Sequence, residues 1–402
     1  MEISKEGQEY LALLDPNIAP VLLFVDYNVD DSEYNTDGED YFIDDEGEEL
    51  DHASNNSLDE DINEDAEDEE DGKLGEVDDR CEEDNEGSEE DVGTDEVTDN
   101  DDQEEDDTVF IYSITKRQLM SKRVEEFNTH FYWTTPQGWL LMVHPESHKV
   151  FLWSPFIDQR INLPFDEDGF FTNNTVRCLL SHKPTDSNCV VLVVNCRNTI
   201  FWYCHPQGHA WFKHEYQSSI ISTRESHKDV IKTMKLLTAI NGRFYTYLCN
   251  DKAIVTLEFL PKPTFRTTPV EDAPNPSYWS IYTSYFLESC GDLFMLSYKH
   301  PVLCAQKVSQ IEVHKLDLSR RIWVKVSTIG NMAFFVDSTD SGVSASLNAE
   351  DVGLKRNCIY YVRPKDKGLY IYDIERGTTS VHNPGVDLAD YLTPDIMMTP
   401  LS

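Results

Sequence analysis

The chain has 402 residues, with 75 Asp and Glu against 33 Lys and Arg, and its net charge is −42. Of the acidic side chains, 42 lie between Asp26 and Asp107, where the only basic ones are Lys73 and Arg80. This segment carries −40 and leaves −2 for all other residues, so a nearly neutral folded part is predicted beside a polyanion. Nucleic-acid binding is disfavoured, because the polyanion repels phosphates.

The start of the chain and its apolar runs argue against secretion and membrane insertion. The opening "MEISKEGQEYLALLDPNIAP" lacks the basic and long apolar regions of a signal peptide. The runs "VLLFV" and "CVVLVV" are too short to span a bilayer. The nine cysteines form no CxxC pair and are expected to be reduced thiols. We therefore expect a cytoplasmic or nuclear protein that does not enter a membrane.

The first predicted element is a strand at residues 20–27, "PVLLFVDY", which follows a short extension at residues 1–19. Residues 28–107 then form the acidic segment, and no aromatic side chain occurs from Ile43 to Asp107. Such a segment buries too little apolar surface to offset its ordering entropy, so it is predicted to be disordered. Loop-closure entropy grows slowly with length, so we expect an insertion between two strands rather than a free tail.

Residues 108–402 repeat one unit, in which an apolar alternating strand is followed by a polar turn and a second strand. The stretch "IEVHKLDLSRRIWVKV" is a clear example. Six such units begin 41 to 58 residues apart, at Val109, Val150, Thr199, Ala253, Ile311 and Leu369. Most are preceded by another β-rich run, such as "RFYTYL" or "CIYYV". Strands that recur at this spacing are typical of the blades of a β-propeller.

We therefore predict an all-β fold, a β-propeller of about six or seven blades. A seventh blade has room between Thr264 and Ser284. The last unit offers three clear strands, and we expect Pro20–Val25 to complete the ring near Val109–Ile114. In this arrangement the N-terminal edge of the ring is joined to its C-terminal edge.

The combination and order of these motifs resemble the plant KIB-type β-propeller family of F-box-associated, kelch-like domains. The stretches that carry the resemblance include "PVLLF", "PQGWLLMV", "FLWSPFIDQRINLP", "AINGRFYTY", "YFLESCGDLFML" and "LYIYDIERGTTSV". The family implies a relation to substrate receptors of ubiquitin ligases, in which an F-box binds the adaptor Skp1 and the propeller takes the client. Only 19 residues precede "PVLLF", too few for a helical F-box, so we do not expect Skp1 to dock on this chain.

The resemblance implies a non-catalytic propeller that binds a protein client of unknown identity. The sequence contains no GxGxxG, GxxxxGK[ST], GxSxG or HExxH motif, and we predict no enzymatic activity, no cofactor and no metal. A second hypothesis gives the main role to the acidic insertion, which would capture basic proteins such as histones while the propeller serves as a scaffold.

Two groups of polar residues in the propeller could carry chemistry. The stretch "CHPQGHAWFKH" brings together Cys204, His205, His209 and His214. Zinc needs four nitrogen or sulfur ligands in a tetrahedral array, and without a second ligand pair nearby a hairpin turn is the favoured interpretation. Asp166 and Asp168 in "PFDEDGF" could act as an acid–base pair, but a solvated loop is favoured.

The acidic insertion contains the remaining candidate sites. An acidic residue stands three places after each of four hydroxyl residues, a pattern that suits an acid-directed kinase: Thr36, Ser57, Ser88 and Thr98. In "YNTDGEDYFID", the aromatic side chains of Tyr34, Tyr41 and Phe42 form the predicted docking point. The basic pairs of "KRQLMSKR", Lys116–Arg123, could form a nuclear import signal, but a strand–turn–strand with charges facing water is favoured.

Overall fold

The structure is a computed structural model that describes residues 20–25, 108–172, 175–217, 233–234, 236–248, 251–259, 262–271, 280–301, 307–337, 344–386 and 388–400. The chain separates into two units, one formed by residues 1–27 with 105–402 and the other by residues 28–104. All the described residues belong to the first unit. The predicted acidic insertion lies outside them.

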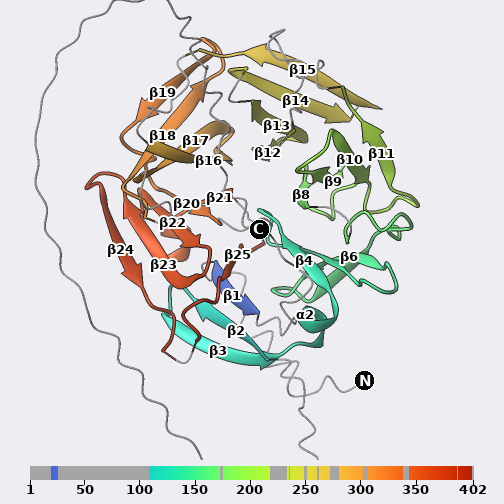
Figure 1. Ribbon diagram of the computed structural model, residues 1–402, viewed down its shortest axis with the longest axis horizontal. Coiled ribbons are helices and arrows are strands. Elements are labelled where there is room, and N and C mark those ends of the chain that lie inside the picture. The colour runs from blue at the N-terminus through green and yellow to red at the C-terminus, as the bar shows by residue number, and fades with distance from the viewer. Residues whose placement is uncertain are drawn as a thin grey trace, which may run out of the picture. The chain divides into compact units, whose positions relative to one another are not determined.

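Six sheets, the blades, stand in a ring (Figure 1). The strands of each blade are named here in order from the centre of the ring to its rim. The first blade contains β25 (Asp395–Met397), β1 (Val21–Val25), β2 (Thr108–Ser113) and β3 (Gln118–Arg123). The second contains β4 (Phe131–Thr134), β5 (Leu140–Val143), β6 (Val150–Ser154) and β7 (Gln159–Asn162). The third contains β8 (Val176–Leu180), β9 (Val191–Asn195), β10 (Ile200–Cys204) and β11 (Phe212–Glu215).

The second half of the ring has the same plan with one variation. The fourth blade contains β12 (Leu237–Ile240), β13 (Arg243–Leu248), β14 (Ala253–Phe259) and β15 (Pro263–Pro269). The fifth contains β16 (Ser280–Ser289), β17 (Asp292–Pro301), β18 (Gln310–Asp317) and β19 (Ile322–Val326). The sixth has five strands, in the order β21 (Ser344–Asn348), β20 (Met332–Val336), β22 (Cys358–Arg363), β23 (Asp366–Asp373) and β24 (Thr378–His382). Within it, β20 and β22 run parallel.

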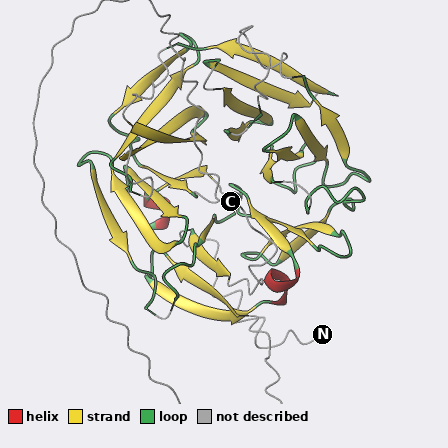
Figure 2. Ribbon diagram, viewed as in Figure 1, coloured by secondary structure: helices red, strands yellow, loops and turns green. Residues whose placement is uncertain are grey.

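Helix is scarce in the described part of the chain, where α2 (Glu125–Thr129) and the short 3-10 turn η1 (Glu350–Val352) accompany the strands (Figure 2). None of the described helices is long and apolar enough to cross a membrane. The prediction of an all-β propeller is confirmed, with six blades. The strands of the Thr264–Ser284 region are parts of β15 and β16, in the fourth and fifth blades, so the suggested seventh blade is wrong.

The repeat found in the sequence corresponds to the two outer strands of each blade. The stretch that begins at Ile311 forms β18 and β19, paired from Val313↔Val326 to Asp317↔Ile322. The β-rich runs that precede the units form the next strand inward, as "RFYTYL" does in β13 and "CIYYV" in β22. Strands covered by a neighbouring blade on both faces read as continuous apolar runs, as β9 does, whereas alternation marks strands such as β18 that are less completely buried.

The core is divided into six clusters of buried apolar side chains, one at each interface between neighbouring blades. At the interface between the fourth and fifth blades, for example, Tyr247 and Ile254 face Phe286 and Trp323. The rings of Tyr247 and Trp323 meet edge to face at 5.5 Å. A blade therefore buries its faces only when both neighbours are in place, which explains why the unit is repeated around a ring.

The ring is closed by β1, which lies between β2 and β25 and pairs antiparallel with both. Its five side chains are all buried. Leu22 and Phe24 belong to the cluster shared with the sixth blade, whereas Val21, Leu23 and Val25 belong to the cluster shared with the second. An unbroken apolar strand is required here, because burying each such side chain contributes about 1.5–3 kcal/mol.

Closure of the ring by the N-terminal strand is confirmed, but this strand belongs to a different blade than expected. We expected β1 to supply a strand that the last unit lacked. The sixth blade instead has five strands of its own, and β1 is the second strand of the first blade. The missing innermost strand of that blade is β25, a short segment near the end of the chain.

The residues after β25 lie directly on the turn between β4 and β5 of the second blade. At Gly138, which has a φ of +75°, an added Cβ would lie 2.4 Å from the nitrogen of Pro400 and 2.8 Å from the carbonyl oxygen of Met398. Only glycine allows this close approach, so the C-terminal residues join the first blade to the second near the ring centre.

Cutting the chain between β1 and β2 should leave β1 bound to the ring. We expect the two fragments of a variant cleaved at a specific protease site in residues 28–104 to co-elute in size-exclusion chromatography and to separate only in denaturant. The control Leu23→Asp places a charge at a fully buried position and should release the N-terminal fragment after cleavage. Release of the fragment without that substitution would contradict the role of β1 in closure.

Replacing Gly138 by Ala should destabilise the ring more than replacing Gly291, which has a similar φ of +83° and no atom within 4 Å of an added Cβ. Both substitutions carry a backbone cost of about 1–2 kcal/mol. Only Gly138→Ala adds overpacking against the C-terminal residues, which costs about 1–3 kcal/mol more. Equal losses in the free energy of unfolding, measured by urea denaturation, would show that the C-terminal contact contributes nothing.

Candidate interaction surface

The candidate sites of the acidic insertion lie outside the described residues. They are the hydroxyl residues Thr36, Ser57, Ser88 and Thr98 and the aromatic residues Tyr34, Tyr41 and Phe42. Phosphorylation and docking at these positions remain predictions.

The cysteine and histidine group of "CHPQGHAWFKH" does not converge. Cys204 ends β10 and is buried in the cluster between the second and third blades. His214 lies on β11 opposite Phe201, and the two rings are 5.0 Å apart. Phe201 belongs to the cluster between the third and fourth blades, so Cys204 and His214 are directed to opposite faces of one sheet. The group is the hairpin between β10 and β11, and no cluster of metal-binding residues is found in the described ranges.

The two aspartates of "PFDEDGF" have different surroundings and do not form an acid–base pair. Asp168 is exposed, whereas the side chain of Asp166 is fully buried. The Asp166 carboxylate accepts hydrogen bonds from the backbone N–H groups of Phe170 at 2.9 Å and Phe171 at 3.0 Å. The expectation of a solvated loop is therefore wrong for Asp166, because its carboxylate orders the turn whose Phe170 ring stacks on Trp202 at 4.5 Å.

The stretch Lys116–Arg123 forms the turn between β2 and β3 and then β3 itself. Lys116 and Arg117 are exposed at the tip of this hairpin. The strand–turn–strand interpretation is therefore correct, and it places Arg117 at the seam between the first and the last blade.

A cleft of about 320 Å³ opens at this seam. The first blade contributes the end of β2 and the β2–β3 turn, and the sixth blade contributes the segment after η1 and parts of β22, β23 and β24. The lining residues are Tyr112, Ile114, Thr115, Arg117, Gly353, Leu354, Lys355, Tyr360, Leu369, Ile371, Ser380 and His382. None of them is acidic, although the chain as a whole is strongly anionic.

The floor of the cleft belongs to the hydrophobic core. Tyr360 stacks on Phe335 at 5.1 Å, and its hydroxyl accepts a hydrogen bond from the Lys355 backbone N–H at 3.0 Å. Burial raises the pKa of Tyr360 to about 12, so its hydroxyl keeps its proton at neutral pH. The floor is thus a rigid and uncharged surface at which the two blades meet.

The rim of the cleft is basic, and Arg117 dominates it. Burial lowers the pKa of His382, and the positive charge of Arg117 lowers it further. The same charge also opposes the effect of burial on the pKa of Tyr112. Arg117 is therefore close to cleft residues on both blades, and its field acts on the interior of the cleft.

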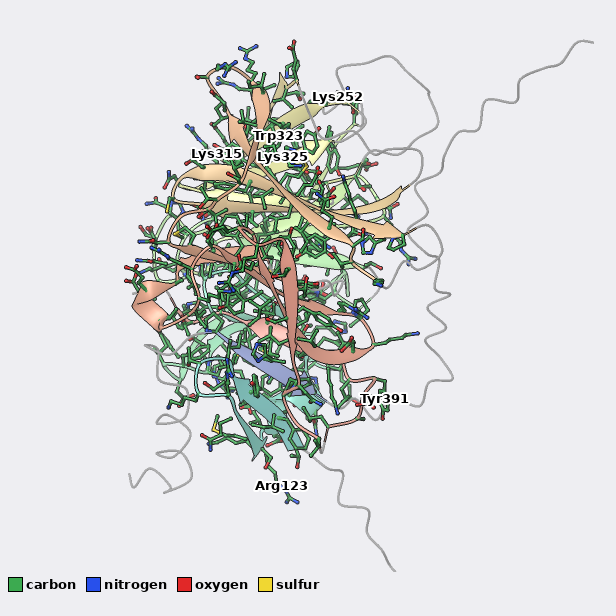
Figure 3. All side chains as sticks on the ribbon, turned by 90° about the vertical axis from the view of Figure 1, so that its left-hand side faces the viewer. Arg123, Lys252, Lys315, Trp323, Lys325 and Tyr391 are labelled. Atoms are coloured by element: carbon green, nitrogen blue, oxygen red, sulfur yellow. The ribbon has the colours of Figure 1, made fainter. Side chains whose placement is uncertain are left out.

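Several basic side chains of the described ring form ion pairs, whereas none is found there for Arg117. Lys315 pairs with Asp292 at 2.6 Å and Lys325 with Glu312 at 2.8 Å. Figure 3 shows both lysines close together on the fifth blade. Lys355, on the rim of the cleft, pairs with Asp373 at 2.7 Å. No ion pair of Arg117 is found among the described residues, where its side chain is exposed at the tip of the hairpin.

No pattern in the sequence predicted this cleft. The residues of its two walls are separated by more than 200 positions, and none of them is part of a catalytic motif. An arginine at a hairpin tip becomes informative only when ring closure places it beside the last blade.

The fold and the seam define a six-bladed β-propeller closed by strands from both ends of the chain. The KIB1-4 beta-propeller family model matches residues 111–383, which is well over half of the chain. The chain therefore belongs to the KIB1-4 beta-propeller family.

Curated relatives in Arabidopsis thaliana agree with this assignment. An F-box/kelch-repeat protein is 25% identical over 273 residues, which cover 64% of this chain and 68% of the relative. An F-box protein is 20% identical over 280 residues, which cover 64% of this chain and 67% of the relative.

Among solved structures, a functionally unknown protein from Desulfotomaculum acetoxidans aligns over 72% of this chain and 86% of its own chain. The two share 12% identity and have a TM-score of 0.35.

Asp166→Ala should destabilise the protein, whereas Asp168→Ala should not. Loss of the buried carboxylate leaves two backbone N–H groups without partners, and hydrogen bonds to charged groups contribute about 1.5–3 kcal/mol each. We expect a loss of about 3 kcal/mol in the free energy of unfolding for Asp166→Ala and less than about 0.5 kcal/mol for Asp168→Ala. Equal stabilities in urea denaturation would show that Asp166 does not have this structural role.

Proposed function

We propose that this chain is a non-catalytic protein-binding propeller of the cytoplasm or nucleus, which holds a client protein on the surface of its ring. The observation that carries the proposal is the family match, which runs from the first blade into the sixth and joins the chain to F-box/kelch proteins. The polar groups that could have served catalysis have structural surroundings, as Asp166 and Cys204 illustrate. The exposed turns of the blades offer a rigid frame for recognition.

We also propose that the chain does not dock Skp1 by itself. The described residues ahead of the family match are those of β1 and the beginning of β2. They are used to close the ring, and β1 is buried between two blades. A client bound by such a propeller is held without being delivered to a ligase, so the chain would compete with F-box relatives for it.

A second candidate function rests on the acidic segment. With the adjoining Asp26, its net charge of −40 stands against −2 for all the rest of the chain. A polyanion of this kind can capture basic proteins through electrostatic attraction, which weakens as salt is added. In this alternative the ring is a scaffold, and the captured partners are basic.

Affinity purification with mass spectrometry distinguishes the two functions. One bait is the full chain, and the other has residues 28–106 replaced by a short hairpin turn, which the pairing of Val25 with Val109 permits. We expect the same client with both baits and no stoichiometric Skp1 with either. Partners lost with the replacement, and basic in composition, would instead support the polyanion function. Stoichiometric Skp1 would overturn the proposal that the chain does not dock Skp1 by itself.

A further inference from the structure

We infer that the seam cleft between the first and sixth blades is the site that recognises an acidic segment of the client, with an apolar side chain on its floor and carboxylates against Arg117. This inference rests on the proposed function and adds the chemistry of the bound segment. It concerns the cleft lined by Arg117 and Lys355, not the turns of the other blades.

The floor provides the apolar half of the site. Ile114 and Leu354 line it together with Leu369 and Ile371, and the ring of Tyr360 completes it. Its volume of about 320 Å³ is at the lower end of the range for ligand pockets. This space suits a single large side chain of a peptide, whose burial contributes through the hydrophobic effect.

The rim provides the charged half of the site. The guanidinium of Arg117 is planar and presents several N–H donors in a fork that matches a carboxylate. Arg117 has no ion pair among the described residues, and Lys355 adds a second positive charge that Asp373 partly offsets. Because no lining residue is acidic, the rim attracts an anionic group and repels a basic one.

A buried hydroxyl group beside the cleft has no hydrogen-bond partner among the described residues. It is the Oγ1 atom of Thr115. Thr115 lies in the β2–β3 turn, two positions before Arg117, and lines the same cleft. A buried polar atom without a partner is costly, and a bound carboxylate or backbone carbonyl could accept its hydrogen bond.

The attraction of an anionic group to the cleft depends on the charges close to it. At physiological salt, charges act over a Debye length of about 8 Å, so the local basic rim determines what binds in the cleft. Outside Asp26–Asp107 the chain carries a net charge of only −2, so the overall charge of the ring neither attracts nor repels an acidic peptide strongly.

The test uses the full chain and three labelled peptides of one design. The acidic probe has the core Glu-Asp-Phe-Asp-Glu between Gly-Ser flanks, the amide probe has Gln and Asn in place of Glu and Asp, and the third has Ala in place of Phe. Fluorescence anisotropy at physiological salt measures their affinities. We expect the acidic probe to bind at least about tenfold more tightly than either of the others. The amide probe loses the charge-assisted contact, and the third probe loses the buried aromatic side chain.

Arg117→Gln and Lys116→Gln form a matched pair of variants. Both remove one positive charge from the same turn, but only Arg117 lines the cleft. We expect Arg117→Gln to lower the affinity for the acidic probe about tenfold and to leave the affinity for the amide probe unchanged. Lys116→Gln should bind the acidic probe with the same affinity as the unsubstituted chain. Thermal unfolding of both variants is measured alongside, because an unchanged melting temperature shows that the ring is intact.

Three results would overturn the inference: equal binding of the acidic and amide probes, an equal effect of the two substitutions, or no binding of any probe. These outcomes are separable from failure of the proposed function. If the full chain still captures its client and Arg117→Gln captures it equally well, the ring is a protein-binding module that uses another surface.

Discussion

The pairing of β1 with β2 on one side and β25 on the other is the interaction on which the rest of the structure depends. Each blade exposes two apolar faces, and its stability comes from clusters shared with both neighbours. An open row of blades would leave two such faces in water. Because β1 comes from one end of the chain and β25 from the other, the first blade cannot form without both, and closure and folding of that blade are one event.

Closure also creates the seam between the first and sixth blades, where segments far apart in the sequence meet. The hairpin tip at Arg117 is brought beside β24 and the segment after η1, and a cleft remains between them. The lining is apolar at its floor, where Tyr360 joins the core, and basic at its rim. The cleft therefore has a basic rim, although the net charge of the whole chain is −42.

Hydrophobic alternation predicted the outer strands well and the innermost strands poorly. The pair β18–β19 has long alternating strands and a polar turn, and both strands were expected. By contrast, β4 (Phe131–Thr134) has four residues and β25 only three, too few to show a period. The parallel pairing of β20 with β22 in the sixth blade has no sequence signature either, because strand direction is not encoded in side-chain alternation. Asp166 was misjudged for a related reason, since its burial comes from a turn packed between two blades.

The sequence by itself determined the repeated two-strand unit, the apolar closing strand and the separation of charge between the ring and the acidic segment. These properties are local, because side-chain period and composition are written along the chain. Tertiary structure alone decided the number of blades, the partner of β1 near the ring centre and the place of the cleft. Each of these depends on contacts between residues that are far apart in sequence, as Arg117 and His382 are, and such contacts exist only after the two ends of the chain have met.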